Sequence, residues 1–217
     1  MLKIRVFAFN DFGENTYLLY DTDTLDALVV DPGMVTAAEQ QLFDRFVTDN
    51  QLKIRQIVNT HLHVDHCIGA DWVRSRYGVK LAADLAEKPL GDAVAQQARM
   101  FGMPLDAEPS PVVIDVPLRD GDTVTLDSNC HLRVISVPGH SPGGIVLYCA
   151  EGSFAFTGDS IFSGSIGRTD LPGGNHAQLV AALRAKVLTL PDDTQLLPGH
   201  GPGTTVAREK AANPYVC

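Results

Sequence analysis

Positive charge, long apolar runs and paired cysteines are all scarce in this sequence. Lysine and arginine number 17 against 26 acidic residues, which gives a formal net charge of −9. Non-specific binding to nucleic acid or to an anionic membrane depends on clustered basic side chains that displace counterions. The charge balance argues against both kinds of partner, and we expect the protein to bind neither nucleic acid nor a membrane.

No apolar run approaches the roughly 18 residues that read as a membrane-spanning helix. Residues 1–7 alternate like a strand, whereas a signal peptide has a continuous apolar segment. These two features predict a cytoplasmic protein. The four cysteines show no paired spacing, which indicates reduced thiols rather than a disulfide framework: Cys67, Cys130, Cys149 and Cys217.

The sequence does contain enough apolar residues for a substantial core. It has 217 residues with 45% hydrophobic content, and domains typically contain roughly 100 to 200 residues. We therefore expect one domain over residues 1–217, with a helical insert at about 85–104.

Hydrophobic periodicity predicts the order of the elements. In the first half, strands are expected at 2–9, 15–20, 26–31, 54–58 and 79–83, with one helix over 36–48 behind a Thr36 cap and another that ends at Gly78. In the second half, strands are expected at 112–115, 123–126, 131–137, 144–149, 153–157 and 195–197, with helices over 176–188 behind an Asn175 cap and from about Thr205.

The residues with the most evident chemistry lie in the segment 60–66, which reads Thr-His-Leu-His-Val-Asp-His. His61 and His63 are two positions apart, so both imidazoles project to one side of an extended segment. Asp65 and His66 need a sharp turn that aims them at a second point nearby. The segment therefore offers two pairs of ligands of the type that zinc and iron prefer.

Three more candidate ligands lie far along the chain, each after a predicted strand and beside glycine: His140, Asp159 and His200. Strand ends bring distant residues to one edge of a sheet, where a rigid scaffold holds functional loops. We therefore expect seven candidate ligands for two metal ions. His131 and His176 lie outside these motifs and are expected to be structural or exposed.

Four motifs, at 60–66, 138–143, 158–159 and 199–200, occur in an order that resembles the metallo-β-lactamase-fold superfamily. The resemblance implies an α+β fold, a four-layer αβ/βα sandwich with the metal site at one edge of its two sheets. It implies two divalent metal ions, zinc being favoured over iron or manganese. It assigns His61, His63 and His140 to the first metal, Asp65, His66 and His200 to the second, and Asp159 to a bridge between them.

Finer motifs at 99–102, 158–162 and 167–174 are similar to the small bacterial glyoxalase II-like enzymes, which are hydroxyacylglutathione hydrolase-like. This resemblance implies that a metal-bridging hydroxide, oriented by the catalytic residue Asp65, hydrolyses a small-molecule thioester. Glutathione or another thiol would be the carrier. Arg168, whose planar guanidinium suits a carboxylate, and Phe162 would then bind the substrate.

Two other activities stay open on the same fold. A persulfide dioxygenase would hold a single Fe(II) through His61, His140 and Asp159, and the run 167–170 also resembles those enzymes. The continuation 171–174 favours the hydrolase. A β-lactamase is disfavoured because the sequence shows no signal segment and offers no cysteine ligand at the second metal.

Overall fold

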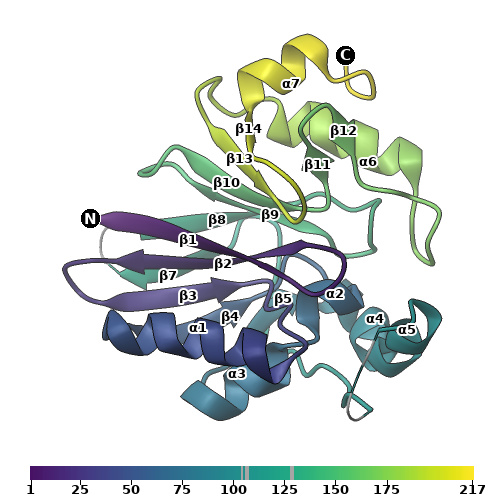
Figure 1. Ribbon diagram of the computed structural model, residues 1–217. Coiled ribbons are helices and arrows are strands. Elements are labelled where there is room, and N and C mark those ends of the chain that lie inside the picture. Colours follow the sequence, from purple (N-terminus) through teal and green to yellow (C-terminus); the bar gives the residue numbers. More distant parts are fainter. Residues whose placement is uncertain (104, 106–107, 128–129) are drawn as a thin grey trace. The chain divides into compact units, whose positions relative to one another are not determined.

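The computed structural model describes residues 1–103, 105, 108–127 and 130–217. The chain forms two compact units, Met1–Pro117 and Leu118–Cys217. Each unit has its own sheet and its own helices (Figure 1). The expectation of a single domain over residues 1–217 stays a prediction.

The first unit is built on a mixed sheet with the strand order β1-β2-β3-β4-β5-β6. Strands β1, β2 and β3 are antiparallel neighbours, whereas β3, β4 and β5 are parallel. The unit boundary falls within β6. The strands are β1 (Leu2–Phe9), β2 (Glu14–Asp21), β3 (Asp26–Val30), β4 (Lys53–Val58), β5 (Leu81–Asp84) and β6 (Val116–Leu118).

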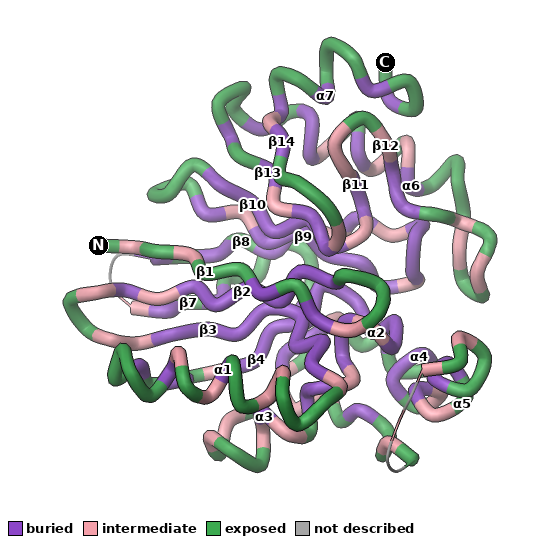
Figure 2. The backbone as a smooth tube through the Cα atoms, viewed as in Figure 1, coloured by how far each residue is buried: buried purple, intermediate pink, exposed green. Residues whose placement is uncertain are grey.

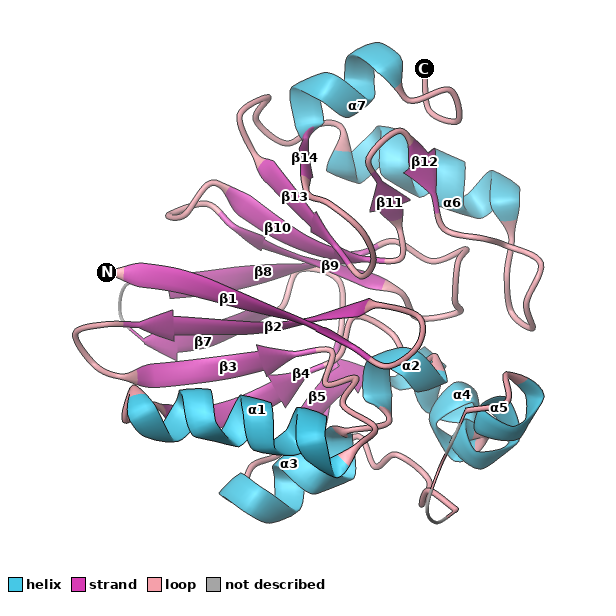
Figure 3. Ribbon diagram, in the orientation of Figure 1, coloured by secondary structure: helices cyan, strands magenta, loops and turns pink. Residues whose placement is uncertain are grey.

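Helices α1 (Ala37–Asp49) and α3 (Ala70–Tyr77) lie along this sheet (Figure 3). Figure 2 shows β2 and β3 buried along nearly their whole length. Phe43 of α1 is fully buried among aromatic rings that include Phe7, at a ring-centroid distance of 5.4 Å. The remaining helices of the unit are α2 (Val64–Cys67), the 3-10 helix η1 (Leu85–Glu87), α4 (Lys88–Asp92) and α5 (Val94–Met100).

The second unit has a mixed sheet with the order β14-β13-β10-β9-β8-β7, in which only β10 and β13 are parallel neighbours. The core of this unit contains buried residues from the helical segment that follows β12, such as Leu179 and Val187. These pack in one cluster with strand residues such as Val146. The sheet strands are β7 (Thr123–Asp127), β8 (Cys130–Ser136), β9 (Ile145–Cys149), β10 (Phe154–Gly158), β13 (Gln195–Pro198) and β14 (Thr204–Thr205). A small hairpin is formed by β11 (Ile161–Phe162) and β12 (Ser165–Ile166), and the helices are α6 (His176–Ala182), the π-helical turn η2 (Leu183–Val187) and α7 (Val206–Ala212).

The predicted helix ends are confirmed by their caps. Thr36 and Glu39 form a reciprocal capping box at the start of α1, and Asn175 caps α6. Gly78 ends α3 in the left-handed conformation, with φ +68°, which glycine adopts without the steric penalty of a Cβ atom. The predicted insert contains η1, α4 and α5; its last residue, Pro104, lies outside the described residues.

The strand predicted at 112–115 is wrong, since the strand here is β6 at Val116–Leu118. Val112 donates its N–H to the carbonyl of Gly91, and the Asp115 carboxylate accepts the N–H of Leu81. These partners hold the segment without a strand ladder. The two-residue strands β11, β12 and β14 were not predicted, because so few residues show no periodicity. None of the helices in the described ranges is long and apolar enough to cross a membrane.

Candidate metal centre

The first unit gathers the histidines of the 60–66 segment. Strand β4 ends at Val58 and leads into His61 and His63, while α2 carries His66. The His61 ring centroid lies 4.8 Å from that of His63 and 4.1 Å from that of His66. All three side chains are buried. The three imidazoles of the 60–66 segment therefore lie close together within this unit.

Asp31, directly after β3, fixes the orientation of His66. Its Oδ1 accepts the backbone N–H of Thr60 at 2.7 Å, and its Oδ2 accepts the Thr60 hydroxyl at 2.6 Å. Oδ2 also lies 3.1 Å from Nδ1 of His66. An ionised carboxylate only accepts hydrogen bonds, so Nδ1 of His66 carries the proton. Nε2 is then left with the lone pair that a metal requires.

Thr60 extends the same arrangement to His61. The single hydroxyl proton of Thr60 is donated to Asp31, and the hydroxyl oxygen lies 3.0 Å from Nδ1 of His61. His61 must therefore donate from Nδ1, and its Nε2 is also left as an acceptor. Ligand atoms of Asp31, His61 and His66 lie within 4.8 Å of one another. Both oxygens of Asp31 already accept hydrogen bonds, so Asp31 positions the two histidines instead of joining them as a ligand.

Sequence reasoning missed Asp31, although Asp-Pro-Gly directly after a buried strand is a recognisable signal. Its backbone has φ +51°, a conformation that few residues other than glycine adopt. The hydrogen bonds to Thr60 and His66 compensate for this strain by fixing the carboxylate on two sides.

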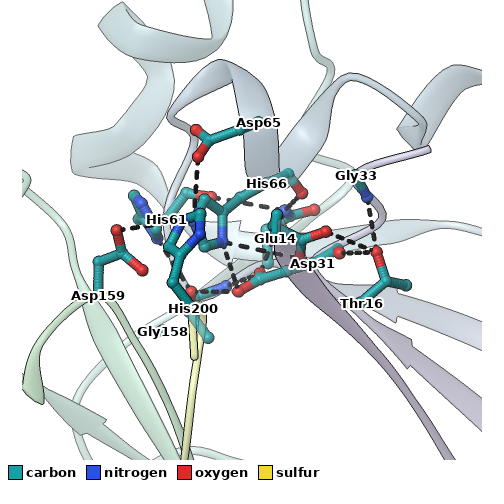
Figure 4. A network of polar contacts seen from close by, with 12 residues as sticks. Glu14, Thr16, Asp31, Gly33, His61, Asp65, His66, Gly158, Asp159 and His200 are labelled. Atoms are coloured by element: carbon teal, nitrogen blue, oxygen red, sulfur yellow. Dashed lines mark hydrogen bonds and ion pairs between the residues drawn. The ribbon is translucent and has the colours of Figure 1, made fainter. Parts of the chain in front are cut away.

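Beneath this network lies a buried carboxyl, Glu14, which is fully enclosed (Figure 4). Burial raises the pKa of Glu14 well above its usual value. Thr16 Oγ1 lies 2.8 Å from Glu14 Oε2 and 2.8 Å from the Asp31 carbonyl, and accepts the N–H of Gly33 at 2.9 Å. Thr16 has one proton to donate, and the carbonyl can only accept it. If Glu14 is neutral and donates its proton to Thr16 Oγ1, the Thr16 hydroxyl is able to donate to the Asp31 carbonyl while it accepts from Glu14 and from Gly33.

Asp65 is held through its backbone. The side-chain amide of Asn10 donates to the carbonyls of both Gly33 and Asp65, at 2.9 and 3.0 Å. A Cβ atom on Gly33 would collide with the Asp65 carbonyl and with Glu14. The close approach of these backbones therefore requires glycine at position 33.

The second unit gathers the other three predicted ligands. Strands β10 and β13 are parallel neighbours, so Asp159 and His200 follow adjacent strand ends. The N–H of Gly199 donates to the carbonyl of Gly158 at 2.9 Å and holds the two ends together. Oδ2 of Asp159 lies 3.6 Å from Nε2 of His140 and 3.6 Å from Nε2 of His200. Asp159 therefore stands between the two histidines.

The orientation of His140 is set by a backbone partner. Its Nδ1 lies 2.7 Å from the carbonyl oxygen of Arg168, which can only accept. His140 therefore also directs an unprotonated Nε2 toward Asp159. A Cβ atom on Gly167 would overlap the Asp159 carbonyl and lie 2.9 Å from Nδ1 of His140. Glycine at 167 allows this close packing.

The two predicted substrate-binding residues lie on the same unit. The half-buried Phe162, on β11, has its ring centroid 6.4 Å from that of His200. The Arg168 guanidinium makes two 2.8 Å hydrogen bonds to the carboxylate of the exposed Asp170. These bonds lower the pKa of Asp170 to about 2. A substrate carboxylate would have to displace Asp170 from Arg168.

The donor set in each unit fits divalent metal ions. Imidazoles whose Nδ1–H groups are already hydrogen-bonded present Nε2, and carboxylates stand beside them, as zinc and non-haem iron sites require. His131 and His176 are both exposed, as predicted, and His131 pairs with Glu151 at 2.9 Å.

Comparisons with known proteins agree with these observations. The family model described as the metallo-beta-lactamase superfamily matches residues 10–200. The chain is 32% identical to hydroxyacylglutathione hydrolase GloC of Haemophilus influenzae, over 99% of this chain and 98% of that protein. It is 34% identical to the probable metallo-hydrolase YqgX of Bacillus subtilis, over 99% and 98%.

Solved structures give the same result for the fold. BLEG-1, described as a B3 metallo-beta-lactamase, matches with a TM-score of 0.87 and 31% identity, over 99% of both chains. TTHA1623 in a di-iron-bound form matches with a TM-score of 0.85 and 31% identity, over 97% of this chain and 99% of that one. The metallo-beta-lactamase fold expected from the motifs is confirmed. The chain belongs to the metallo-beta-lactamase superfamily, as one of its metal-dependent hydrolases.

Proposed function

We propose that the protein is a binuclear metallohydrolase that cleaves small-molecule thioesters, in the manner of hydroxyacylglutathione hydrolases. One observation carries the proposal: in both units, histidine rings are held by hydrogen bonds at Nδ1 that leave Nε2 available as a ligand atom. The similarity to GloC, which extends over nearly the full length of both chains, supports this substrate class.

The proposed ligands follow the family motifs residue by residue. One metal is assigned His61, His63 and His140, the other Asp65, His66 and His200, and Asp159 is shared by both. The position of Asp159 at 3.6 Å from Nε2 of both His140 and His200 supports its role as the shared ligand. Zinc is the favoured metal and iron or manganese are the alternatives; the similar protein TTHA1623 was solved with two irons.

Bound at these residues, two such cations would lower the pKa of a water and polarise a carbonyl, which is the chemistry that thioester hydrolysis needs. Asp65 orients the attacking water with its carboxylate, while Asn10 fixes the backbone of Asp65 from behind. The leaving thiol has a free pKa of about 8.5 and departs as a thiolate without a general acid. An amine leaving group would need a proton from a general acid.

Substrate recognition is assigned to Arg168 and Phe162. The Arg168 guanidinium already binds a carboxylate through two parallel hydrogen bonds, the geometry that a substrate carboxylate would adopt in place of Asp170. Phe162 offers a half-buried aromatic face beside His200. The thiol carrier is glutathione or another thiol with a carboxylate.

The test combines metal analysis with a substrate panel. Protein purified anaerobically without chelator should contain about two metals per chain and hydrolyse thioesters, beginning with lactoylglutathione. Asp159→Ala should lose metal and activity together. The control variant Asp170→Asn, which changes an exposed aspartate of the same unit, should keep its metal. A single Fe(II) per chain with O₂ uptake on glutathione persulfide would replace the proposal with the dioxygenase alternative.

A further inference from the structure

The inserted helices contact the metal-ligand segment at its backbone, on both sides of His63. The N–H of Leu62 donates to Oε2 of Glu87 at 2.8 Å, and the N–H of Val64 donates to Oε1 of Gln97 at 3.2 Å. Nε2 of Gln97 donates back to the Leu62 carbonyl at 3.3 Å. Both insert side chains are buried, with exposures of 0% for Glu87 and 6% for Gln97.

Gln97 supplies the cap that α2 lacks. His63 occupies the N-cap position of α2, and its side chain makes no capping hydrogen bond. The first N–H groups of a helix need acceptors, which serine, threonine, asparagine or aspartate at the N-cap position ordinarily provide. Here the N-cap side chain is an imidazole among other imidazoles, and Gln97 accepts the N–H of Val64 in its place.

The amide of Gln97 is itself fixed in one orientation. Its Nε2 also donates to the Leu90 carbonyl at 2.8 Å, so two carbonyls face the NH₂ group and one N–H faces the oxygen. Rotation of the amide by 180° would place like groups against each other at all three contacts. The side chain therefore ties α4, through Leu90, to the peptide groups on both sides of His63.

From these contacts we infer that Gln97 is a positioning residue for metal binding, which holds His63 and the start of α2 in the geometry that ligation requires. This inference rests on the proposed metal role of His63 and His66. Loss of Gln97 should therefore disturb the geometry of the segment 62–66 and leave the structure of the rest of the fold unchanged.

Three variants test the inference in the full-length protein. Gln97→Met fills a similar volume but removes every hydrogen bond. Gln97→Glu keeps an acceptor for the N–H of Val64 but turns a carboxylate oxygen toward the two carbonyls. Gln96→Met is the matched control, because Gln96 is the exposed neighbour on the same helix.

The first measurement is the affinity for Zn²⁺ by chelator competition, together with the absorption spectrum of the Co²⁺-substituted protein. Loss of a supporting contact behind a ligand typically weakens metal affinity about 10- to 100-fold. Gln97→Met should show a loss of this size and a changed Co²⁺ spectrum, Gln97→Glu a smaller loss, and Gln96→Met none. Equal affinities for Gln97→Met and wild type would overturn the inference.

The second measurement needs no metal. Amide hydrogen exchange of the metal-free protein should show faster exchange at Val64 in Gln97→Met but not in Gln97→Glu, with the amides of β2 and β3 unchanged. Unaltered protection of Val64 in Gln97→Met contradicts the inference. If Gln97→Met fails to fold, Gln97→Glu still carries the Zn²⁺ measurement, and a wild-type Zn²⁺ affinity in Gln97→Glu overturns the inference. A wild-type protein that binds no metal refutes the proposed function instead.

Discussion

Replacement of Asp31 by asparagine should weaken metal binding without removing any proposed ligand. Asp31 accepts hydrogen bonds at both oxygens: two from Thr60, one from His66 and one from the side-chain amide of Asn59. An asparagine side chain of nearly the same shape offers one acceptor oxygen and one NH₂ group that only donates. The partners of one of the two oxygens must therefore change their donors and acceptors. The asparagine amide has two possible orientations, and these have different consequences.

If the NH₂ group takes the place of Oδ2, the Thr60 hydroxyl accepts from it and donates to Nδ1 of His61. His66 must likewise accept at Nδ1. Both imidazoles then carry their proton on Nε2, the atom assigned to the metal. The expected cost is about 10- to 100-fold in metal affinity, or roughly 1.4 to 2.8 kcal/mol at about 1.4 kcal/mol per factor of ten.

If the NH₂ group instead takes the place of Oδ1, it faces the buried N–H of Thr60, whose present partner lies at 2.7 Å. An unsatisfied buried donor costs about 1–3 kcal/mol. In this orientation the histidine tautomers survive and the metal-free protein loses stability. Either orientation gives a measurable defect, and the two are distinguished by where the defect is found.

The assay is Zn²⁺ competition with a chelator, combined with urea unfolding of the metal-free protein and ¹⁵N NMR of the imidazoles to assign the tautomers. Asp26→Asn is the control, since Asp26 is the first residue of β3, the strand that Asp31 follows, and pairs with the exposed Arg55 at 2.7 Å. Wild-type metal affinity, tautomers and stability in Asp31→Asn would refute this account of Asp31.

Three further predictions concern packing and charge. Gly167→Ala places a methyl group against the Asp159 carbonyl and His140, so metal affinity measured by chelator competition should fall at least about tenfold. Gly164→Ala has open space around its Cβ but a left-handed φ of +75°, so it should lose some stability and still bind metal normally. Arg168 lowers the pKa of Asp170 to about 2. The stabilisation from this ion pair is therefore complete above the ordinary aspartate pKa and is lost as the pH falls from about 4 to about 2. A carboxyl ¹³C titration of Asp170 should show a midpoint that returns toward about 4 in Arg168→Met. Phe43→Ala should lower the free energy of unfolding by about 3–5 kcal/mol in urea titrations, since Phe43 is fully buried among Phe7, Trp72 and Tyr77; a loss below about 1 kcal/mol would mean that the aromatic cluster repacks.

Local sequence signals predicted the elements whose causes are themselves local. Thr36 with Glu39, Gly78 and Asn175 mark helix ends because a cap depends on residues within one turn. The closeness of His61, His63 and His66 is also a local property, since a short segment leaves few ways to separate them.

The hydrophobic pattern could not predict hydrogen bonds between residues that lie far apart in the sequence. The segment 112–115 has the composition of a strand, yet its polar groups are taken by Gly91 and Leu81. Asp31 is marked by the Asp-Pro-Gly turn, but nothing in that turn identifies its partner Thr60, 29 positions later. Gln97 looks like an ordinary helix residue, 33 positions after Val64. Their roles depend on which strands and helices become neighbours, which no local window contains.

The sequence by itself determined the family, the ligand types and most of the helices and strands, because periodicity and motif spacing are properties of short segments. Only the tertiary structure decided which ring nitrogen carries the proton in His61, His66 and His140. That choice depends on a single acceptor at hydrogen-bond distance: the hydroxyl of Thr60 for His61, the carboxylate of Asp31 for His66 and the carbonyl of Arg168 for His140. Two of these acceptors come from distant parts of the chain, and the backbone fold alone brings them to the ring.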